Sequence, residues 1–220
     1  MKKTQPILIA VIFLISASLF IVYKHPTLLG NNLAEKSIID VPSSFLINPA
    51  PYPLKSGRTP APILSAKAAI VMDADSKKVM YEKNRELRFS PASTVKIMTA
   101  LVALERYSLS DLLTVQTEST IPSTMVLVEV EVISFESLLY GLLLNSGNDA
   151  ALALAENYPS GTTAFVARMN GKAKKLSLTD TFFSDVSGLD DNGNFTTATD
   201  LAQLLISWRF LEKINYILNK

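Results

Sequence analysis

Hydrophobic residues at the start of the chain form one uncharged run from Pro6 to Tyr23. As a helix, this run would extend about 27 Å, close to the thickness of a bilayer core. Lys2 and Lys3 precede the run and outnumber Lys24 behind it, which predicts that the rest of the chain lies outside the cytoplasm. We interpret residues 1–24 as an N-terminal membrane anchor, which makes the protein a single-pass membrane protein with an extracytoplasmic domain.

A cleaved signal peptide is the alternative interpretation of the same segment, with Ser16 and Ser18 as the small residues of a cleavage site. The hydrophobic run continues beyond both serines, where a cleavage region should become polar, so the anchor is favoured. With cleavage, the protein would instead be secreted. Both interpretations place the folded body outside the cytoplasm.

Polar and proline-rich sequence follows over residues 25–62, which hold seven of the 11 prolines. Proline favours extended chain, and so little hydrophobic sequence cannot form a core. We therefore predict a linker at 25–62 and a folded domain over residues 63–220.

The pattern inside this domain begins with two short hydrophobic strands, at 69–72 and 79–81, separated by a polar turn, which predicts a hairpin. Hydrophobic spacing after the hairpin predicts helices around 95–104, 135–144, 149–156, 165–176 and 201–208. Apolar residues occupy nearly every side of 95–104, as in a buried central helix. The expected fold class is mixed α and β (α+β), with an early hairpin and mainly helices after it.

Composition narrows the function. The chain is 48% hydrophobic and 19% charged, which is typical of a globular protein, and its net charge is +1. Because no long basic run is present, we expect no nucleic-acid partner.

Chemistry is limited by the absence of cysteine and by a single histidine, His25, beside the hydrophobic N-terminal run. Thiol catalysis, cysteine metal sites and a Ser-His-Asp arrangement in the folded domain are thereby excluded. We expect no metal and no cofactor, and any serine chemistry requires a base other than histidine.

The sharpest candidate motif is Ser93-x-x-Lys96 at the predicted start of the helix at 95–104. Ser90 is a good N-cap residue and Pro91 a favoured first helical residue, so Ser93 is expected in the first turn. Unpaired backbone N–H groups there would stabilise an oxyanion beside Ser93. Lys96, three residues on, is expected beside Ser93 on one helix face.

Burial and the positive helix end should lower the pKa of Lys96 toward that of a general base. The alternative is a capped helix that carries one lysine with its charged end in solvent. The spacing of Ser93 and Lys96 does not by itself distinguish these interpretations.

A second polar segment, Ser146-Gly147-Asn148, interrupts two hydrophobic helices. A simple helix break is one explanation, with Gly147 for backbone freedom and Asn148 as the cap of the next helix. A cavity lined by the hydroxyl and the amide is the other.

The order of the two segments, S-x-x-K followed by S-x-N, occurs among penicillin-binding proteins and β-lactamases, where a K-T-G completes the set. Residues 63–210 resemble the D-alanyl-D-alanine carboxypeptidases of serine peptidase family S11. The similar patches are Ala68 to Asp73, Tyr81 to Asn84, Lys96 to Leu101, Leu138 to Ala151, Phe165 to Asn170, and Gly188-Leu189 with Thr196 to Ala202.

The resemblance implies a penicillin-binding-protein or β-lactamase-like transpeptidase fold, with helices against an antiparallel sheet. It implies that Ser93 attacks the D-Ala-D-Ala end of a peptidoglycan stem peptide and that Lys96 is the base. It further implies that Ser146 relays a proton, that Asn148 contacts the substrate, and that β-lactams acylate Ser93.

No K-T-G follows Ser146 in the sequence, and Lys55-Ser56-Gly57 lies in the predicted linker before the first strand. We therefore expect a C-terminally truncated, weakly active or inactive enzyme with an incomplete sheet. Two alternatives are a class A β-lactamase-like hydrolase and a non-catalytic, membrane-tethered cell-wall-binding protein. The β-lactamase is disfavoured because Gly147 replaces the aspartate of its triplet and no E-x-x-L-N segment follows.

Overall fold

The computed structural model describes residues 50–54, 57, 60–117, 125–189 and 193–207. The chain divides into two units at Pro49, and all described residues belong to the second unit. The predicted anchor at 1–24 and most of the predicted linker lie outside the described residues, so both stay predictions. Within the described part, no helix is both long and apolar enough to cross a bilayer.

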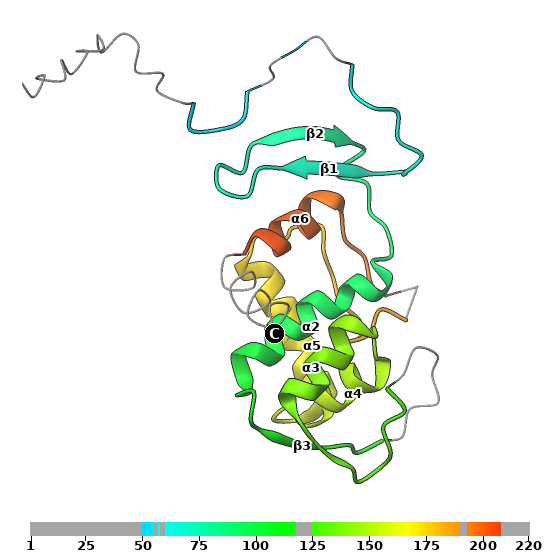
Figure 1. Cartoon of the computed structure of the whole chain (residues 1–220). Helices are drawn as coiled ribbons and strands as arrows, with labels where there is room; N and C mark the ends of the chain where they lie inside the picture. Colours follow the sequence, from blue (N-terminus) through cyan, green and yellow to red (C-terminus); the bar gives the residue numbers. More distant parts are fainter. Residues whose placement is uncertain (1–49, 55–56, 58–59, 118–124, 190–192, 208–220) are drawn as a thin grey trace, which may run out of the picture. The chain divides into compact units, whose positions relative to one another are not determined.

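The predicted hairpin is confirmed. Strands β1 (Ala69–Met72) and β2 (Val79–Lys83) pair antiparallel, with Ala69 opposite Lys83 (Figure 1). The turn is closed by Asp73, whose carboxylate accepts from the Ser76 backbone N–H at 2.8 Å. An aspartate that binds the backbone of its own turn is a common turn former.

The five predicted helices are confirmed in place and type, with ends that differ by a few residues. A 3₁₀ turn, η3 (Ala92–Thr94), leads into α2 (Val95–Arg106), and α3 (Phe135–Leu144), α4 (Asn148–Glu156), α5 (Gly161–Lys175) and α6 (Ala198–Ile206) follow. The predicted last helical position, Trp208, lies outside the described residues.

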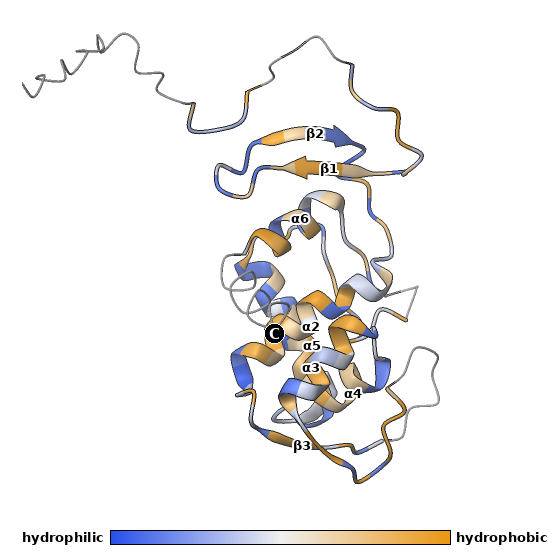
Figure 2. Ribbon diagram, in the orientation of Figure 1, coloured by the Kyte–Doolittle hydropathy of each residue, from blue (hydrophilic) through white to orange (hydrophobic). Residues whose placement is uncertain are grey.

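Helix α2 is the centre of the core, as its pattern predicted. It packs against α3, α4 and α5, and its side chains from Met98 to Leu104 are buried. Figure 2 shows hydrophobic residues along most of α2 and α3. The largest fully buried side chains, Phe135 and Phe165, come from α3 and α5. Burial of each such ring stabilises the fold by roughly 1.5–3 kcal/mol.

A second antiparallel pair, β3 (Leu112–Thr114) with β4 (Val132–Ser134), was not predicted. Strands of three residues carry too few positions for an alternating pattern to be recognised. Ser134 ends β4 and also caps α3, because its side chain accepts from the Ser137 N–H. The described residues thus form helices with two small antiparallel sheets, which confirms the mixed α and β class.

Candidate active site

Ser93 was expected in the first turn of the helix. It lies instead in the 3₁₀ turn η3, which directly precedes α2. The predicted side-chain cap is wrong, because no side chain caps η3 and the capping position is Pro91 instead of Ser90. The turn is closed by Thr94, whose backbone N–H donates to the Pro91 carbonyl at 3.1 Å. Ser93 is therefore presented at the start of the central buried helix, as the motif required.

Lys96 reaches back to Ser93. Its Nζ lies 3.3 Å from Ser93 Oγ, and the lysine is only 3% exposed. Burial lowers the pKa of Lys96, and the nearby Asp185 carboxylate partly opposes this effect. A lysine that loses its proton more readily than usual, at hydrogen-bond distance from a serine hydroxyl, has the chemistry of a general base.

Ser146 completes a cavity with these two residues. The cavity, of about 410 Å³, is lined by Ser93, Lys96 and Ser146, with hydrophobic walls that include Ile97 and Leu143. The structure therefore brings three of the four predicted site residues to one cavity, although Ser93 and Ser146 are far apart in sequence.

The fourth predicted residue, Asn148, is placed differently. It begins α4, is only 4% exposed, and is not among the residues that line the cavity. Its role in substrate contact stays a prediction, and it does not cap α4, whose capping position is Gly147 without a side-chain bond.

The glycine at position 147 has a different reason from the predicted one. Its φ of −60° is open to any residue. A Cβ there would lie 3.1 Å from Met125 Cγ and 3.2 Å from the Gly141 carbonyl oxygen. Close packing, and not backbone freedom, therefore favours glycine. The left-handed residue of this loop is Ser146, with φ of 57°.

A loop that sequence reasoning missed forms another side of the site. Lys96 Nζ donates to the Ser187 carbonyl at 2.7 Å, and Thr99, one turn further along α2, donates to the Val186 carbonyl at 2.7 Å. Asp185 accepts from the Ser187 and Gly188 backbone N–H groups at 2.5 and 2.6 Å. The patch at Gly188 was recognised only as part of the family resemblance.

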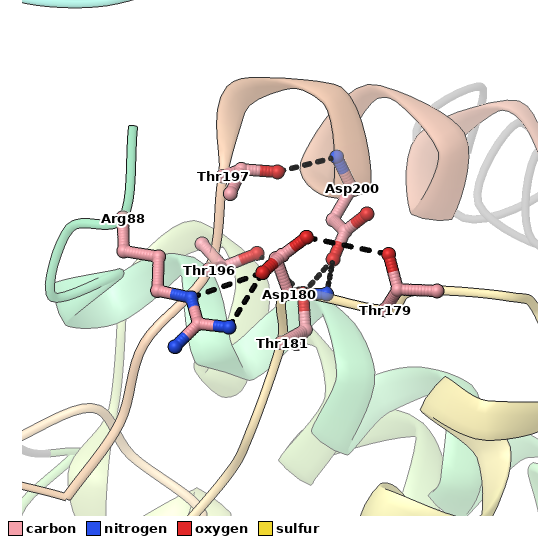
Figure 3. Close-up of polar contacts among 7 residues, drawn as sticks. All are labelled: Arg88, Thr179, Asp180, Thr181, Thr196, Thr197 and Asp200. Atoms are coloured by element: carbon pink, nitrogen blue, oxygen red, sulfur yellow. Dashed lines mark hydrogen bonds and ion pairs between the residues drawn. The ribbon is translucent and has the colours of Figure 1, made fainter. Parts of the chain in front are cut away.

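The chain that leads into η3 is itself fixed. Phe89 forms a β-bridge with Thr196, and Phe195 forms one with Phe182. Figure 3 shows Arg88 directed at Asp180, with Nε 3.0 Å from the carboxylate.

The same corner is closed from α6. Asp200 accepts from the Asp180 backbone N–H at 2.8 Å and from the Thr181 hydroxyl at 2.7 Å (Figure 3). Thr197 caps α6 by accepting from the Asp200 N–H at 3.1 Å. These bonds hold the entry to η3 and the start of α6 together.

Within the described part of the chain, no three His, Cys, Asp or Glu side chains form a group able to hold a metal ion. Asp185 and Asp200 instead accept hydrogen bonds from backbone and side-chain donors. The Lys96 amine beside the Ser93 hydroxyl could support serine acyl transfer, because an adjacent base activates a hydroxyl nucleophile.

Comparison with known proteins gives the same class. The family described as D-alanyl-D-alanine carboxypeptidase (Peptidase S11) matches residues 55–216. D-alanyl-D-alanine carboxypeptidase DacC of Escherichia coli is 38% identical over 176 residues, which cover 74% of this chain and 44% of that protein. A D-alanyl-D-alanine endopeptidase of Pseudomonas aeruginosa is 37% identical over 161 residues, covering 71% and 52% of the two chains.

Among solved structures, D-alanyl-D-alanine carboxypeptidase DacD from Francisella tularensis is 34% identical with a TM-score of 0.67, over 73% of this chain and 41% of that one. The chain belongs to peptidase family S11, the serine D-alanyl-D-alanine carboxypeptidases, and has the penicillin-binding-protein fold. It spans about half the length of the curated relatives it matches.

Proposed function

We propose that this protein is a serine-type D-Ala-D-Ala carboxypeptidase that acts on peptidoglycan stem peptides. The observation that carries the proposal is the buried Lys96 amine, 3.3 Å from Ser93 Oγ at the edge of a cavity that also exposes Ser146. Family membership supports the substrate class, because relatives are described as carboxypeptidases and endopeptidases of D-alanyl-D-alanine.

In the first step, neutral Lys96 takes the proton of the Ser93 hydroxyl as Oγ attacks the carbonyl between the two D-Ala residues. A C–O bond forms and the carbonyl electrons move to oxygen, beside the backbone N–H groups at the start of the helix. The C–N bond then breaks, and the departing D-Ala amine receives the proton from Lys96 through the Ser146 hydroxyl. The product is an acyl ester on Ser93.

In the second step, water attacks the ester carbonyl and gives up a proton to Lys96. The bond between Ser93 Oγ and the acyl carbon breaks, and Oγ recovers the proton. We assign contact with the substrate to Asn148. A β-lactam would follow the first step with its ring amide in place of the peptide bond, and would acylate Ser93.

The activity of these 220 residues alone is proposed to be weak. No K-T-G follows Ser146 in them, and that motif would hold the substrate carboxylate and form one wall of the site. The test compares β-lactam labelling of this chain with labelling of the chain joined to a K-T-G segment from a relative. Equal labelling would show that the absence of the motif is no defect.

We also propose that the domain works outside the cytoplasm, held by an anchor at residues 1–24 or released by its cleavage. The uncharged run behind Lys2 and Lys3 supports this proposal. Fractionation of expressing cells, combined with protease added to intact spheroplasts, tests it. Protection of the domain in intact spheroplasts would reject it.

The central experiment is labelling with a fluorescent penicillin, followed by mass spectrometry of the labelled peptide. We expect a covalent adduct on Ser93 that is absent in Ser93→Ala and present in Ser137→Ala, a serine variant at the exposed start of α3. Release of D-alanine from an acetylated peptide ending in D-Ala-D-Ala, and not from its L-Ala-L-Ala counterpart, tests the hydrolysis. An adduct that persists in Ser93→Ala would reject Ser93 as nucleophile, and binding to cell wall without any adduct would favour a non-catalytic protein.

A further inference from the structure

The surroundings of Lys96 contain a residue to which the proposed mechanism gives no part. The Lys96 amine lies closer to the carbonyl of Ser187, at 2.7 Å, than to the hydroxyl of Ser93, at 3.3 Å. Ser187 stands 91 positions further along the chain. The direction of the lysine side chain is thus fixed by a backbone carbonyl from a separate loop.

That carbonyl is itself fixed by Asp185. One oxygen, Oδ1, accepts from the Ser187 N–H at 2.5 Å, the Ser187 hydroxyl at 2.9 Å and the Gly188 N–H at 2.6 Å. Three donors on one carboxylate oxygen form a tight turn over 185–188. This turn sets where the Ser187 carbonyl points.

The second oxygen of Asp185 is held by Asn194. The Asn194 side chain is 4% exposed; its amide nitrogen donates to Asp185 Oδ2, and its Oδ1 accepts from the Ser184 N–H at 2.9 Å. The carboxylate therefore cannot rotate without loss of bonds at both ends. Loss of a partner from such a carboxylate network costs free energy, because it leaves polar groups without hydrogen bonds.

The same turn packs against the backbone at Ala92 and Ser93. Gly188 has φ of +84°, and a Cβ on it would lie 1.8 Å from the Ala92 carbonyl oxygen and 3.1 Å from the Ser93 backbone nitrogen. The turn shaped by Asp185 thus contacts both members of the pair, Lys96 through a hydrogen bond and Ser93 through its backbone.

We propose that Asp185 is a positioning residue of this site, whose carboxylate, held by Asn194, places the Ser187 carbonyl on Lys96 and Gly188 against Ser93. The inference rests on the proposed function, in which Lys96 deprotonates Ser93. Asp185 touches neither substrate nor reacting atoms and acts through the turn that it shapes.

The charge of Asp185 has a second effect that supports the geometry. The groups facing the Lys96 amine are the Ser93 hydroxyl, the Ser187 carbonyl and, at longer range, the Asp185 carboxylate, with Ser146 in the same cavity. Asp185 raises the pKa of Lys96 against the larger effect of burial. Neutralisation of Asp185 should therefore lower the pKa of Lys96 further.

The test uses three variants of the full chain: Asp185→Asn, the exchange Asp185→Asn with Asn194→Asp, and Asp111→Asn as a half-buried carboxylate control outside the site. In the exchange, the new amide at position 185 can still accept from the turn through its oxygen. It can also donate to the new carboxylate at position 194, which can still accept from the Ser184 N–H. We expect Asp185→Asn to slow penicillin acylation by about tenfold or more, since small misplacements of reacting groups are costly. The exchange should recover most of the rate, and Asp111→Asn should leave it unchanged.

The pH profile separates positioning from a general loss of fold. In Asp185→Asn, the acid limb of the profile of acylation rate against pH should move to lower pH, because a lower pKa makes Lys96 neutral at lower pH. An unchanged rate and profile in Asp185→Asn would overturn the inference. So would an exchange variant that regains its urea midpoint but not its rate. If Asp185→Asn does not fold, the exchange variant alone decides.

A readout without activity keeps the inference separate from the proposed function. The titration of Lys96 can be followed by NMR in a chain with ¹³C-labelled lysine, with its signal assigned by loss in Lys96→Met. A wild-type chain that penicillin acylates neither alone nor when joined to a K-T-G segment would reject the proposed function. A lower Lys96 pKa in Asp185→Asn would still support the role of Asp185 in that case, and an unmoved pKa would overturn it.

Discussion

Gly188 packs directly against the carbonyl of Ala92: a Cβ at Gly188 would lie 1.8 Å from that oxygen. Ala92 itself has a positive φ of 46°, immediately before Ser93. The backbone beside the proposed nucleophile is therefore held in an uncommon conformation by a neighbour with no side chain.

Gly188→Ala should damage both stability and acylation. The clash is with backbone, which cannot move as a side chain can, and the left-handed φ adds strain, so we expect a loss of at least ~2 kcal/mol of unfolding free energy. The control is Gly171→Ala in α5, where a Cβ meets nothing within 4 Å. It should stabilise the helix by ~0.5–1 kcal/mol. Urea unfolding measures both, and equal effects would contradict the packing argument.

Thr99→Val removes a buried hydroxyl with little change of shape. The Val186 carbonyl then loses a donor at 2.7 Å inside the core, and we expect a cost of ~1–3 kcal/mol. Thr99→Ser, which keeps the hydroxyl, should cost only the buried methyl group, ~0.8 kcal/mol. Thermal unfolding compares the two, and a valine variant as stable as the wild type would show that this bond contributes nothing.

Lys96 should make stability rise with pH. Its pKa is lowered in the folded protein, chiefly by burial, so between that value and the ordinary lysine pKa the unfolded chain binds more protons than the folded one. The unfolding free energy therefore increases through this window and is lowest below it. Lys96→Met should flatten this part of the curve, and equal slopes in both proteins would contradict the lowered pKa.

Tyr107 should have the opposite effect at high pH. Burial raises its pKa to about 12, and its hydroxyl donates to the Leu154 carbonyl at 3.0 Å. The unfolded chain loses this proton near pH 10, before the folded protein does, so Tyr107 lowers stability as pH rises from about 10 to 12. Tyr107→Phe should remove that decline and cost ~1 kcal/mol at neutral pH. Unfolding of both proteins across pH 8 to about 12 tests the difference.

Arg88 should control the titration of Asp180. Hydrogen bonds from Arg88 hold the pKa of Asp180 below its ordinary value. Arg88→Ala should let this pKa rise, which NMR of the carboxyl carbon can follow. Arg85→Ala is the matched control, because Arg85 pairs with Glu82 and Glu86. A rise of the Asp180 pKa in both variants would indicate a general field effect.

Some residues of the candidate site are neighbours in the sequence, and others meet only in the folded protein. Ser93 and Lys96 stand three positions apart, so helical geometry alone brings them together, and the motif was readable from the sequence. Asn148 begins α4 outside the cavity lining, so the contact with substrate that the family resemblance implies for it stays a prediction. Asp185 could not be recognised from its neighbours in the sequence. Its turn is linked to the site through the hydrogen bond from Lys96 to the Ser187 carbonyl.

The amino-acid sequence by itself determined the hairpin, the helices and the order of the motifs, because hydrophobic period and turn residues act over a few positions. The tertiary structure alone decided that the carbonyls of Val186 and Ser187 meet Thr99 and Lys96, across 87 and 91 positions of chain. Carbonyl groups are the same in every residue, so their partners depend on how the chain packs and carry no mark in the sequence.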